Sequence, residues 1–342
     1  MSGRKITAWY ILPVLVLVAC ANDEFTAPTA TVGQWEICTP PYAGAWTHCD
    51  VTEDGTLWAT MILDGSKRAA IVKFDGRRWY KVEFEPSETE ALNDVRVFED
   101  GRGWACGNNG AIVEYDDGRW YPRRIRPNFE FFHLGAYDTW PVWVNGLSRP
   151  GNAPAIYFNS GTGWQEIPAL TGYTSYGPIY MTGDFSGYMI GRTENGDEIL
   201  TLQGITWGPA ISFNEPLHFF DITGADGKCY AAGELRAQEP YLGRVYQLAP
   251  SVKDITPDVL PSDEYYYKAC YADQRGGLWV SAAPYDWLSE EPYRLLYYDA
   301  TGWREVNVGN ETSATTRFFE IDFAGGHGWA VGGKAYARYE QP

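Results

Sequence analysis

Histidine and acidic side chains occur inside several short apolar segments of this chain, where they could transfer protons or bind a metal ion. Four of them are His48, Asp50, Asp94 and His133. Corresponding segments contain Arg96, Asp221, Glu320 and Asp322. A histidine beside two carboxylates can support general acid–base chemistry or hold a metal. The plainer interpretation, which we prefer, is an ion-paired lining of a channel that holds water.

These segments belong to a repeated unit that would have to position them. The unit is seen most clearly in DGTLWATMILDGSKRAAIVKFDGRRW (54–79) and DGRGWACGNNGAIVEYDDGRW (100–120). Each copy has a Gly-containing turn, a first aromatic residue, a short alternating apolar run, and then Gly with a second aromatic residue. The first aromatic residue falls at Trp58, Trp104, Trp143, Tyr188, Tyr230, Trp279 and Trp329. The second falls at Trp79, Trp120, Trp164, Trp207 and Trp303.

The spacing of this unit predicts the fold class. First aromatic residues are 39 to 50 residues apart, and the runs between them have the alternation and turn boundaries of strands. A unit of this length with about four strands is typical of a β-propeller blade. The sequence therefore predicts an all-β, seven-bladed β-propeller over residues 33–342, with almost no helix.

The two ends of the predicted ring are complementary. The last unit stops at Pro342 without the Gly and second aromatic residue that complete the other units. A segment with that pattern, Gly33 to Cys38, begins the ring instead. We therefore expect an N-terminal strand to close the last blade, because a closed ring protects the edges of its sheets.

The N-terminal segment resembles a bacterial lipoprotein leader. Arg4 and Lys5 precede an apolar stretch that is too short to span a bilayer and ends in Leu17-Val18-Ala19-Cys20. This resemblance implies a signal peptide over 1–19, lipid on Cys20 as the membrane anchor, and a tether over 20–32. Ala21 after the cysteine implies the outer membrane. The alternative is an ordinary signal peptide with a chance cysteine.

Charge and motifs limit the classes of function. The net charge is −17, and loss of Arg4 and Lys5 would leave about −19, so we expect no nucleic-acid partner. Segments typical of a P-loop, a GxSxG nucleophile or an HExxH zinc site are absent from the sequence. We predict no cofactor and no metal.

Two long loops and one link offer aromatic residues for recognition. The loops are 234–243 and 283–293, and the link 262–267 lies between their blades. Their aromatic residues are Tyr241, Tyr265, Tyr266, Tyr285 and Trp287. Exposed aromatic rings amid polar groups suit recognition of a protein or a polysaccharide. The alternative is that these loops fold back onto their own sheets.

The remaining tryptophans and cysteines have structural explanations. Most of the tryptophans occupy repeat positions and are expected to pack between blades. Among the cysteines, Cys229 and Cys270 are a weak disulfide candidate, and small buried thiols are the default for all those beyond Cys20.

The units EDGTLWAT…IVKFDGRRW and EDGRGWACGNNGAIVEYDDGRW resemble the periplasmic propeller repeats of hybrid two-component sensors, and also loosely related lipoprotein propellers. The resemblance covers about 33–342 and implies sensing of an extracellular ligand. Sialidases share propeller geometry, but their turns read S-x-D-x-G-x-x-W and they need an arginine triad. Here the turns read D-G-x-x-W, and Arg96 is the one arginine expected in the channel.

Together these observations favour a lipid-anchored binding or scaffold module of the bacterial envelope. Its partner would be an envelope protein or a polysaccharide that docks on one face near blades 5 and 6. The alternative function is a glycan-acting enzyme, a hydrolase or a lyase, that uses His48, Asp50, Asp94 and His133 in the channel.

Overall fold

The computed structural model describes residues 34–38, 41–66, 68–85, 87, 89–286, 291, 293–308, 316–333 and 335–340. They belong to a compact unit that runs from Val32 to Pro342. Within these residues the only helical element is one turn of 3-10 helix, η1 (Asn108–Gly110), and no helix there could cross a membrane. The leader 1–19, Cys20 and the tether 20–32 lie outside the described residues, so their assignments stay predictions.

The strands recur in the same order along the chain, and each has one of four places in its unit. The inner strands are β2 (Gly44–Val51), β6 (Leu92–Val97), β10 (Phe129–Ala136), β14 (Ser175–Gly183), β18 (Leu217–Ala225), β22 (Tyr265–Ala272) and β26 (Thr316–Ala324). The second strands are β3 (Leu57–Leu63), β7 (Gly103–Gly107), β11 (Val142–Ser148), β15 (Ser186–Thr193), β19 (Lys228–Leu235), β23 (Leu278–Pro284) and β27 (His327–Gly333). The third strands are β4 (Ala69–Phe74), β8 (Ala111–Asp116), β12 (Pro154–Asn159), β16 (Gly196–Gln203), β20 (Leu242–Ala249), β24 (Arg294–Asp299) and β28 (Ala335–Glu340). The outer strands are β5 (Trp79–Glu83), β9 (Arg119–Arg124), β13 (Trp164–Ile167), β17 (Thr206–Ile211), β21 (Lys253–Asp254), β25 (Gly302–Val306) and β1 (Gln34–Cys38).

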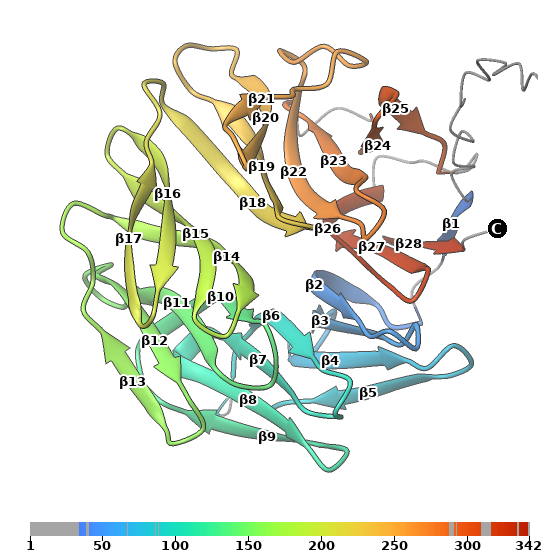
Figure 1. The fold of residues 1–342 in the computed structure, drawn as a ribbon. Helices are drawn as coiled ribbons and strands as arrows, with labels where there is room; N and C mark the ends of the chain where they lie inside the picture. The colour runs from blue at the N-terminus through green and yellow to red at the C-terminus, as the bar shows by residue number, and fades with distance from the viewer. Residues whose placement is uncertain are drawn as a thin grey trace, which may run out of the picture. The chain divides into compact units, whose positions relative to one another are not determined.

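The sheets are antiparallel and are arranged around a central axis, with the inner strands nearest to it (Figure 1). Five sheets have four strands each, and a sixth has eight. The eight-stranded sheet consists of two four-stranded meanders that a single pair, Trp46 opposite Gly333, joins. The all-β prediction is confirmed. The predicted pairing of the N-terminal segment is also confirmed, because β1 pairs with β28 and sets Trp35 opposite Tyr339.

The repeat motif corresponds to particular strands. The apolar runs of the sequence are the third strands, and the first aromatic residues lie on the second strands. The turn before the first aromatic residue needs glycine, since Gly55 and Gly101 have φ values of 80° and 78°, where a side chain is strained. The unit that lacks a second aromatic residue has the shortest outer strand, β21, with two residues.

Aromatic pairs pack one sheet against the next, as the sequence predicted. Trp58 contacts Trp120 of the following sheet, with ring centroids 5.8 Å apart. The same pairing recurs as Trp104–Trp164, Trp143–Trp207, Trp279–Trp35 and Trp329–Trp79. Each such pair contributes roughly 0.5–1.5 kcal/mol beyond the burial of its area. Trp35 of β1 thus takes the place of the missing second aromatic residue of the last unit.

A register shift interrupts every inner strand near its middle or first half. In β10 the shift falls between Phe131 and His133, and in β18 between Phe219 and Asp221. A bulge of this kind adds a residue to one strand and re-aims the side chains beside it. As a result, adjacent residues such as Phe132 and His133 both line the central cavity.

Candidate functional site

The central axis contains two cavities that meet near Arg96, Asp221 and Glu320. The larger chamber has a volume of about 610 Å³ and lies among the first halves of the inner strands. The smaller chamber has a volume of about 310 Å³ and lies among their second halves and the turns that follow. The sequence-predicted residues divide between them, because His48, Asp94 and His133 line the larger chamber and Asp50 lines the smaller one.

In the smaller chamber the polar side chains are bonded to neighbouring strands. Asp50 accepts the backbone N–H of Val97 at 2.6 Å and pairs with the Arg96 guanidinium at 3.0 Å. Asp322 accepts the N–H of Val51 at 2.7 Å, which joins the last inner strand to the first. These are charge-assisted hydrogen bonds between sheets, so much of this polar lining has a structural role.

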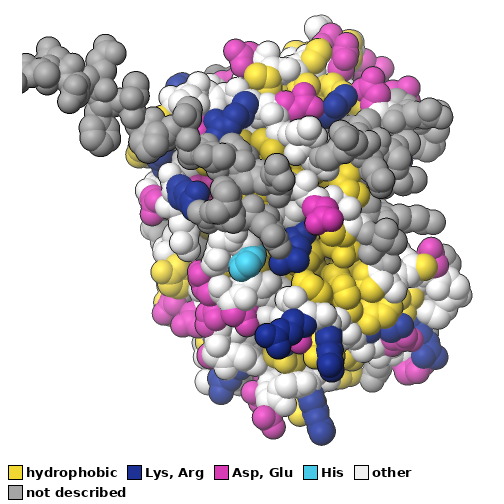
Figure 2. Space-filling view, turned by 90° about the vertical axis from the view of Figure 1, so that its right-hand side faces the viewer, with side chains coloured by type: hydrophobic (Ala, Val, Ile, Leu, Met, Phe, Trp, Pro, Cys, Tyr) yellow, Lys and Arg dark blue, Asp and Glu magenta, His cyan; other side chains and the backbone are white. Residues whose placement is uncertain are grey.

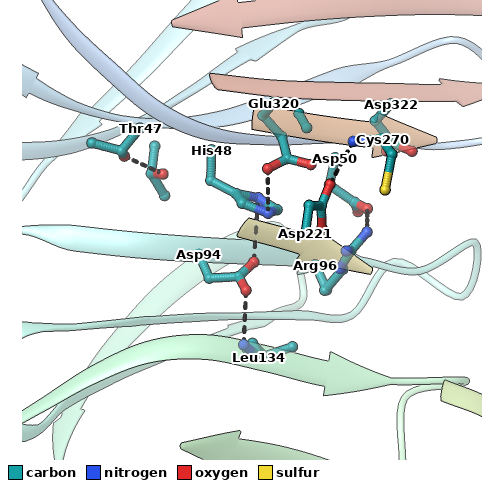
Figure 3. Close-up of polar contacts among 12 residues, drawn as sticks. Thr47, His48, Asp50, Asp94, Arg96, Leu134, Asp221, Cys270, Glu320 and Asp322 are labelled. Carbon is teal, nitrogen blue, oxygen red and sulfur yellow. Dashed lines mark hydrogen bonds and ion pairs between the residues drawn. The ribbon is translucent and has the colours of Figure 1, made fainter. Parts of the chain in front are cut away.

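In the larger chamber a histidine lies between two carboxyl groups. His48 Nδ1 is 3.2 Å from Asp94 Oδ1, and His48 Nε2 is 3.4 Å from Glu320 Oε2 (Figure 3). The other oxygen of Asp94 accepts the N–H of Leu134 at 2.7 Å, which holds the carboxyl group in place. This group is the arrangement that best fits the acid–base chemistry suggested by the sequence.

Burial sets the protonation states of this group. Burial lowers the pKa of His48 well below its usual value, and the charge of Arg96 adds to the effect. Burial also raises the pKa of Asp94 to about 7, although Arg96 opposes the change, and raises the pKa of Glu320 well above its usual value. Burial therefore favours the neutral imidazole and the protonated forms of the two carboxyl groups.

His133 and Lys268 complete the polar part of the larger chamber. Burial lowers the pKa of His133 to about 3, with the charges of Arg192 and Lys268 acting in the same direction. Burial also lowers the pKa of Lys268, against the attraction of Asp221 and Glu320. The ammonium of Lys268 lies over the ring of Phe220, 4.8 Å from its centroid.

Aromatic residues connect this chamber to the loops singled out in the sequence. Phe220, which lines the chamber, contacts Tyr266 with ring centroids 5.2 Å apart. Tyr266 contacts Tyr285 at 5.4 Å, and Tyr285 contacts Tyr241 at 6.3 Å. We call these four residues, Phe220, Tyr266, Tyr285 and Tyr241, the aromatic arc. A series of ring contacts thus leads from the larger chamber to the loops.

Two of the predicted binding residues are not part of this arc. Tyr265 is only 4% exposed and packs in the core between sheets, because neighbouring residues of a strand point to opposite faces. The expectation that it is exposed is therefore wrong. Trp287 lies outside the described residues, and its role stays a prediction.

Sequence reasoning missed the residues that surround the polar group of the larger chamber. These are Phe132, Phe220, Phe319 and Lys268. In a regular strand, side chains alternate, so only one of two adjacent residues points into the channel. At a bulge in an inner strand, both adjacent residues can point into it. A run such as Phe131-Phe132-His133 was a signal, since it breaks the alternation of an inner strand.

The five cysteines among the described residues are free. Cys229 and Cys270, the weak disulfide candidate, are separate buried thiols, and so are Cys49 and Cys106. Cys38 on β1 is partly buried. Within the described residues, no group of three or more His, Cys, Asp or Glu side chains is placed to hold a metal ion.

Surface charge is mixed on the side of the molecule drawn in Figure 2. Lys and Arg side chains stand among Asp and Glu side chains there, and hydrophobic side chains form a patch between them. Nucleic-acid binders normally have a continuous basic face. This view therefore offers no support for a nucleic-acid partner.

Comparisons with known proteins identify the fold. No family model and no curated protein matches the sequence. A chain in the crystal structure of the mitotic checkpoint complex has a TM-score of 0.63 at 10% identity, covering 98% of this chain and 99% of that one. The GH74 xyloglucanase from Xanthomonas campestris has a TM-score of 0.66 at 14% identity, and the match covers 89% of this chain but only 53% of the xyloglucanase chain. The β-propeller domain of the Trilobed protease from Pyrococcus furiosus has a TM-score of 0.54 at 10% identity, and the match covers 78% of this chain and 85% of that domain's chain.

These similarities define the class of protein as a β-propeller. At identities this low they show the fold alone, because propellers host both binding modules and enzymes. Function must be argued from the channel and the aromatic arc.

Proposed function

We propose that the four-stranded units are the seven blades of a closed ring, with β1 completing the last blade. The pairing of β1 with β28 supports this closure. So do the contact of Trp329 with Trp79 and the hydrogen bond from Val51 to Asp322, which both connect the last unit to the first.

We propose that the protein is a binding or scaffold module that recognises a protein or a polysaccharide through the aromatic arc. The observation that carries this proposal is the continuity of the arc with the larger chamber. Tyr241 and Tyr285 lie in or beside loops of two neighbouring sheets, and Phe220 lines the cavity between the inner strands. A partner docked on the loops could therefore reach the chamber, and clustered tyrosines are frequent anchors of interfaces.

A photo-crosslinking amino acid at position 285 tests this surface in intact cells. We expect one defined adduct that Tyr266→Ala reduces at least tenfold, since anchor residues typically contribute about 2 kcal/mol or more. Tyr121→Ala is the matched control, because Tyr121 is 42% exposed on the outer strand β9. A polysaccharide partner would appear as a saccharide adduct. Adducts unaffected by Tyr266→Ala, or equally frequent with the crosslinker at position 121, would contradict the proposal.

We further propose that lipid on Cys20 anchors the protein to the bacterial outer membrane, with 20–32 as the tether. The leader-like sequence before Cys20 supports this. Growth with an alkyne-labelled fatty acid should label the natural chain but not Cys20→Ala. Equal labelling of both chains would show that lipid is attached elsewhere.

The alternative is a glycan-acting enzyme, and one observation favours it. His48 lies between two carboxyl groups whose pKa values are raised by burial, so the group could give and take protons near pH 7. Incubation with envelope polysaccharides separates the alternatives. Turnover that disappears in His48→Ala would establish an enzyme, whereas a binding module gives no turnover with either chain.

A further inference from the structure

The lining of the larger chamber combines apolar and acidic side chains. Phe132, Phe220 and Phe319 come from three different inner strands and line the chamber beside Pro178. His48, Asp94, Asp221 and Glu320 line the same space. A ligand that fills it would need an apolar stem and a polar or charged end.

The channel has more carboxyl groups than cations. Its lining has six carboxyl groups, Asp50, Glu53, Asp94, Asp221, Glu320 and Asp322, and two cations, Arg96 and Lys268. Arg96 pairs with Asp50, and Asp221 is the leading attraction on Lys268. The carboxyl groups on either side of His48 therefore have no cation of their own within ion-pair distance in the described structure.

Hydrogen bonding at this group is also incomplete. Asp94 Oδ1 and His48 Nδ1 are buried and lie 3.2 Å from one another, and neither has a further polar partner among the described residues. The Asp94 side chain is 5% exposed. Because burial lowers the pKa of His48 and favours its neutral form, His48 does not neutralise an ionised Asp94, and a cation in the chamber could do so.

The chain itself shows that a cation is compatible with the apolar side chains of this lining. The Lys268 ammonium lies 4.8 Å from the centroid of Phe220, and no described carboxylate is within ion-pair distance of it. An ammonium over a phenyl ring is held by the quadrupole of the ring. Phe132 and Phe319 offer further rings around the same chamber.

We propose that the larger chamber binds the ammonium or guanidinium of a lysine or arginine side chain of a protein partner, with Asp94 and Glu320 as counter-ions and the phenylalanines around its stem. That the side chain comes from a protein partner rests on the proposed function. Binding of an amine to the chamber can be tested without that partner.

Binding should depend on pH, because a cation replaces protons on the carboxyl groups. The pKa of Asp94 is about 7, so its ionised fraction rises about tenfold from pH 6 to pH 8, and affinity should rise with it. Proton release on binding should accompany this. The charged and titratable groups that line the larger chamber are His48 on β2, Asp94 and Arg96 on β6, His133 on β10, Asp221 on β18, Lys268 on β22 and Glu320 on β26. The smaller chamber adds Asp50, Glu53, Tyr180, Cys270, Tyr271 and Asp322. Arg192 on β15 and Glu234 on β19 act on Lys268 from the second strands.

Calorimetric titration of the purified full chain tests the proposal. The probes are Nα-acetyl-lysine methylamide and its norleucine analogue, which has a similar stem without the charge. At pH 8 we expect the lysine probe to bind at least tenfold more tightly than the norleucine probe. At pH 6, where Asp94 is mostly protonated, the affinity for the lysine probe should fall about tenfold.

Two variants and a matched control locate the site. Glu320→Gln should weaken the lysine probe at least tenfold, and so should Asp94→Asn, in which an amide oxygen can still accept the Leu134 N–H. Glu166→Gln, on the outer strand β13, should change nothing. Equal binding of both probes, no binding of the lysine probe, or no effect of Glu320→Gln in a folded chain would overturn the proposal. If the lysine probe binds but the crosslinker at position 285 gives no adduct, the proposed docking surface is rejected and amine binding by the chamber is kept.

Discussion

The two chambers are built by the same inner strands, yet their polar side chains are used differently. In the smaller chamber, Asp322 accepts the N–H of Val51, and the Tyr271 hydroxyl donates to the Phe323 carbonyl at 2.5 Å. Tyr180 donates to the Gly224 carbonyl in the same way. Each bond joins one sheet to the next. In the larger chamber, Asp94 makes one such bond, from the Leu134 N–H, but its Oδ1 meets only His48 Nδ1, and Glu320 meets only His48 among the described residues.

The difference shows that polarity in a buried channel does not by itself indicate a functional site. Hydrogen-bonded carboxylates in the smaller chamber hold sheets together, because each satisfies a backbone N–H that would otherwise be buried without a partner. Carboxyl groups without a cation in the larger chamber are what favours a ligand. Mutations in the two chambers should therefore have different consequences.

The largest effect is expected from Asp50→Ala in the smaller chamber. This change removes the acceptor of the Val97 N–H and leaves Arg96 without its ion-pair partner. It should lower the free energy of unfolding by roughly 3 kcal/mol, near the low end of such losses because Arg96 remains partly exposed. Urea unfolding, followed by tryptophan fluorescence, measures the change.

Glu320→Gln is the matched change in the larger chamber. Glu320 contacts His48 at 3.4 Å and has no hydrogen bond to another sheet in the described structure. Its loss should change the free energy of unfolding by about 1 kcal/mol or less. A loss equal to that of Asp50→Ala would remove the distinction between the chambers.

Two tyrosines of β22, Tyr271 and Tyr266, should also differ in their effect on stability. Tyr271→Phe removes one hydrogen bond between sheets and should cost about 1 kcal/mol. Tyr266→Phe should be close to neutral, since the Tyr266 hydroxyl is 3.5 Å from that of Tyr293, at the limit of a hydrogen bond. Urea midpoints of the two variants provide the comparison. Equal losses would show that the aromatic arc also has a role in stability.

The predicted fold was largely accessible from the sequence, whereas the candidate site was accessible only in part. The alternation and turns around Trp58 and Trp104 predicted the strands, and the incomplete last unit predicted the pairing of β1 with β28. His48, Asp94 and His133 share the larger chamber, because inner strands face one axis, whereas Asp50, grouped with them from the sequence, lines the smaller one. Phe220 and Lys268 were missed, since a bulge inserts one residue into a strand and changes which side chains point toward the axis.

The sequence by itself determined the repeated four-stranded unit and the complementarity of its two ends. Alternation, turn glycines and the spacing of aromatic residues are local properties that each unit carries within about 50 residues. Only the tertiary structure decided which carboxyl groups pair with a cation and which meet only a histidine in the larger chamber. The acceptor for the Val51 N–H is Asp322, 271 residues away in the chain, and such pairing depends on how the sheets meet.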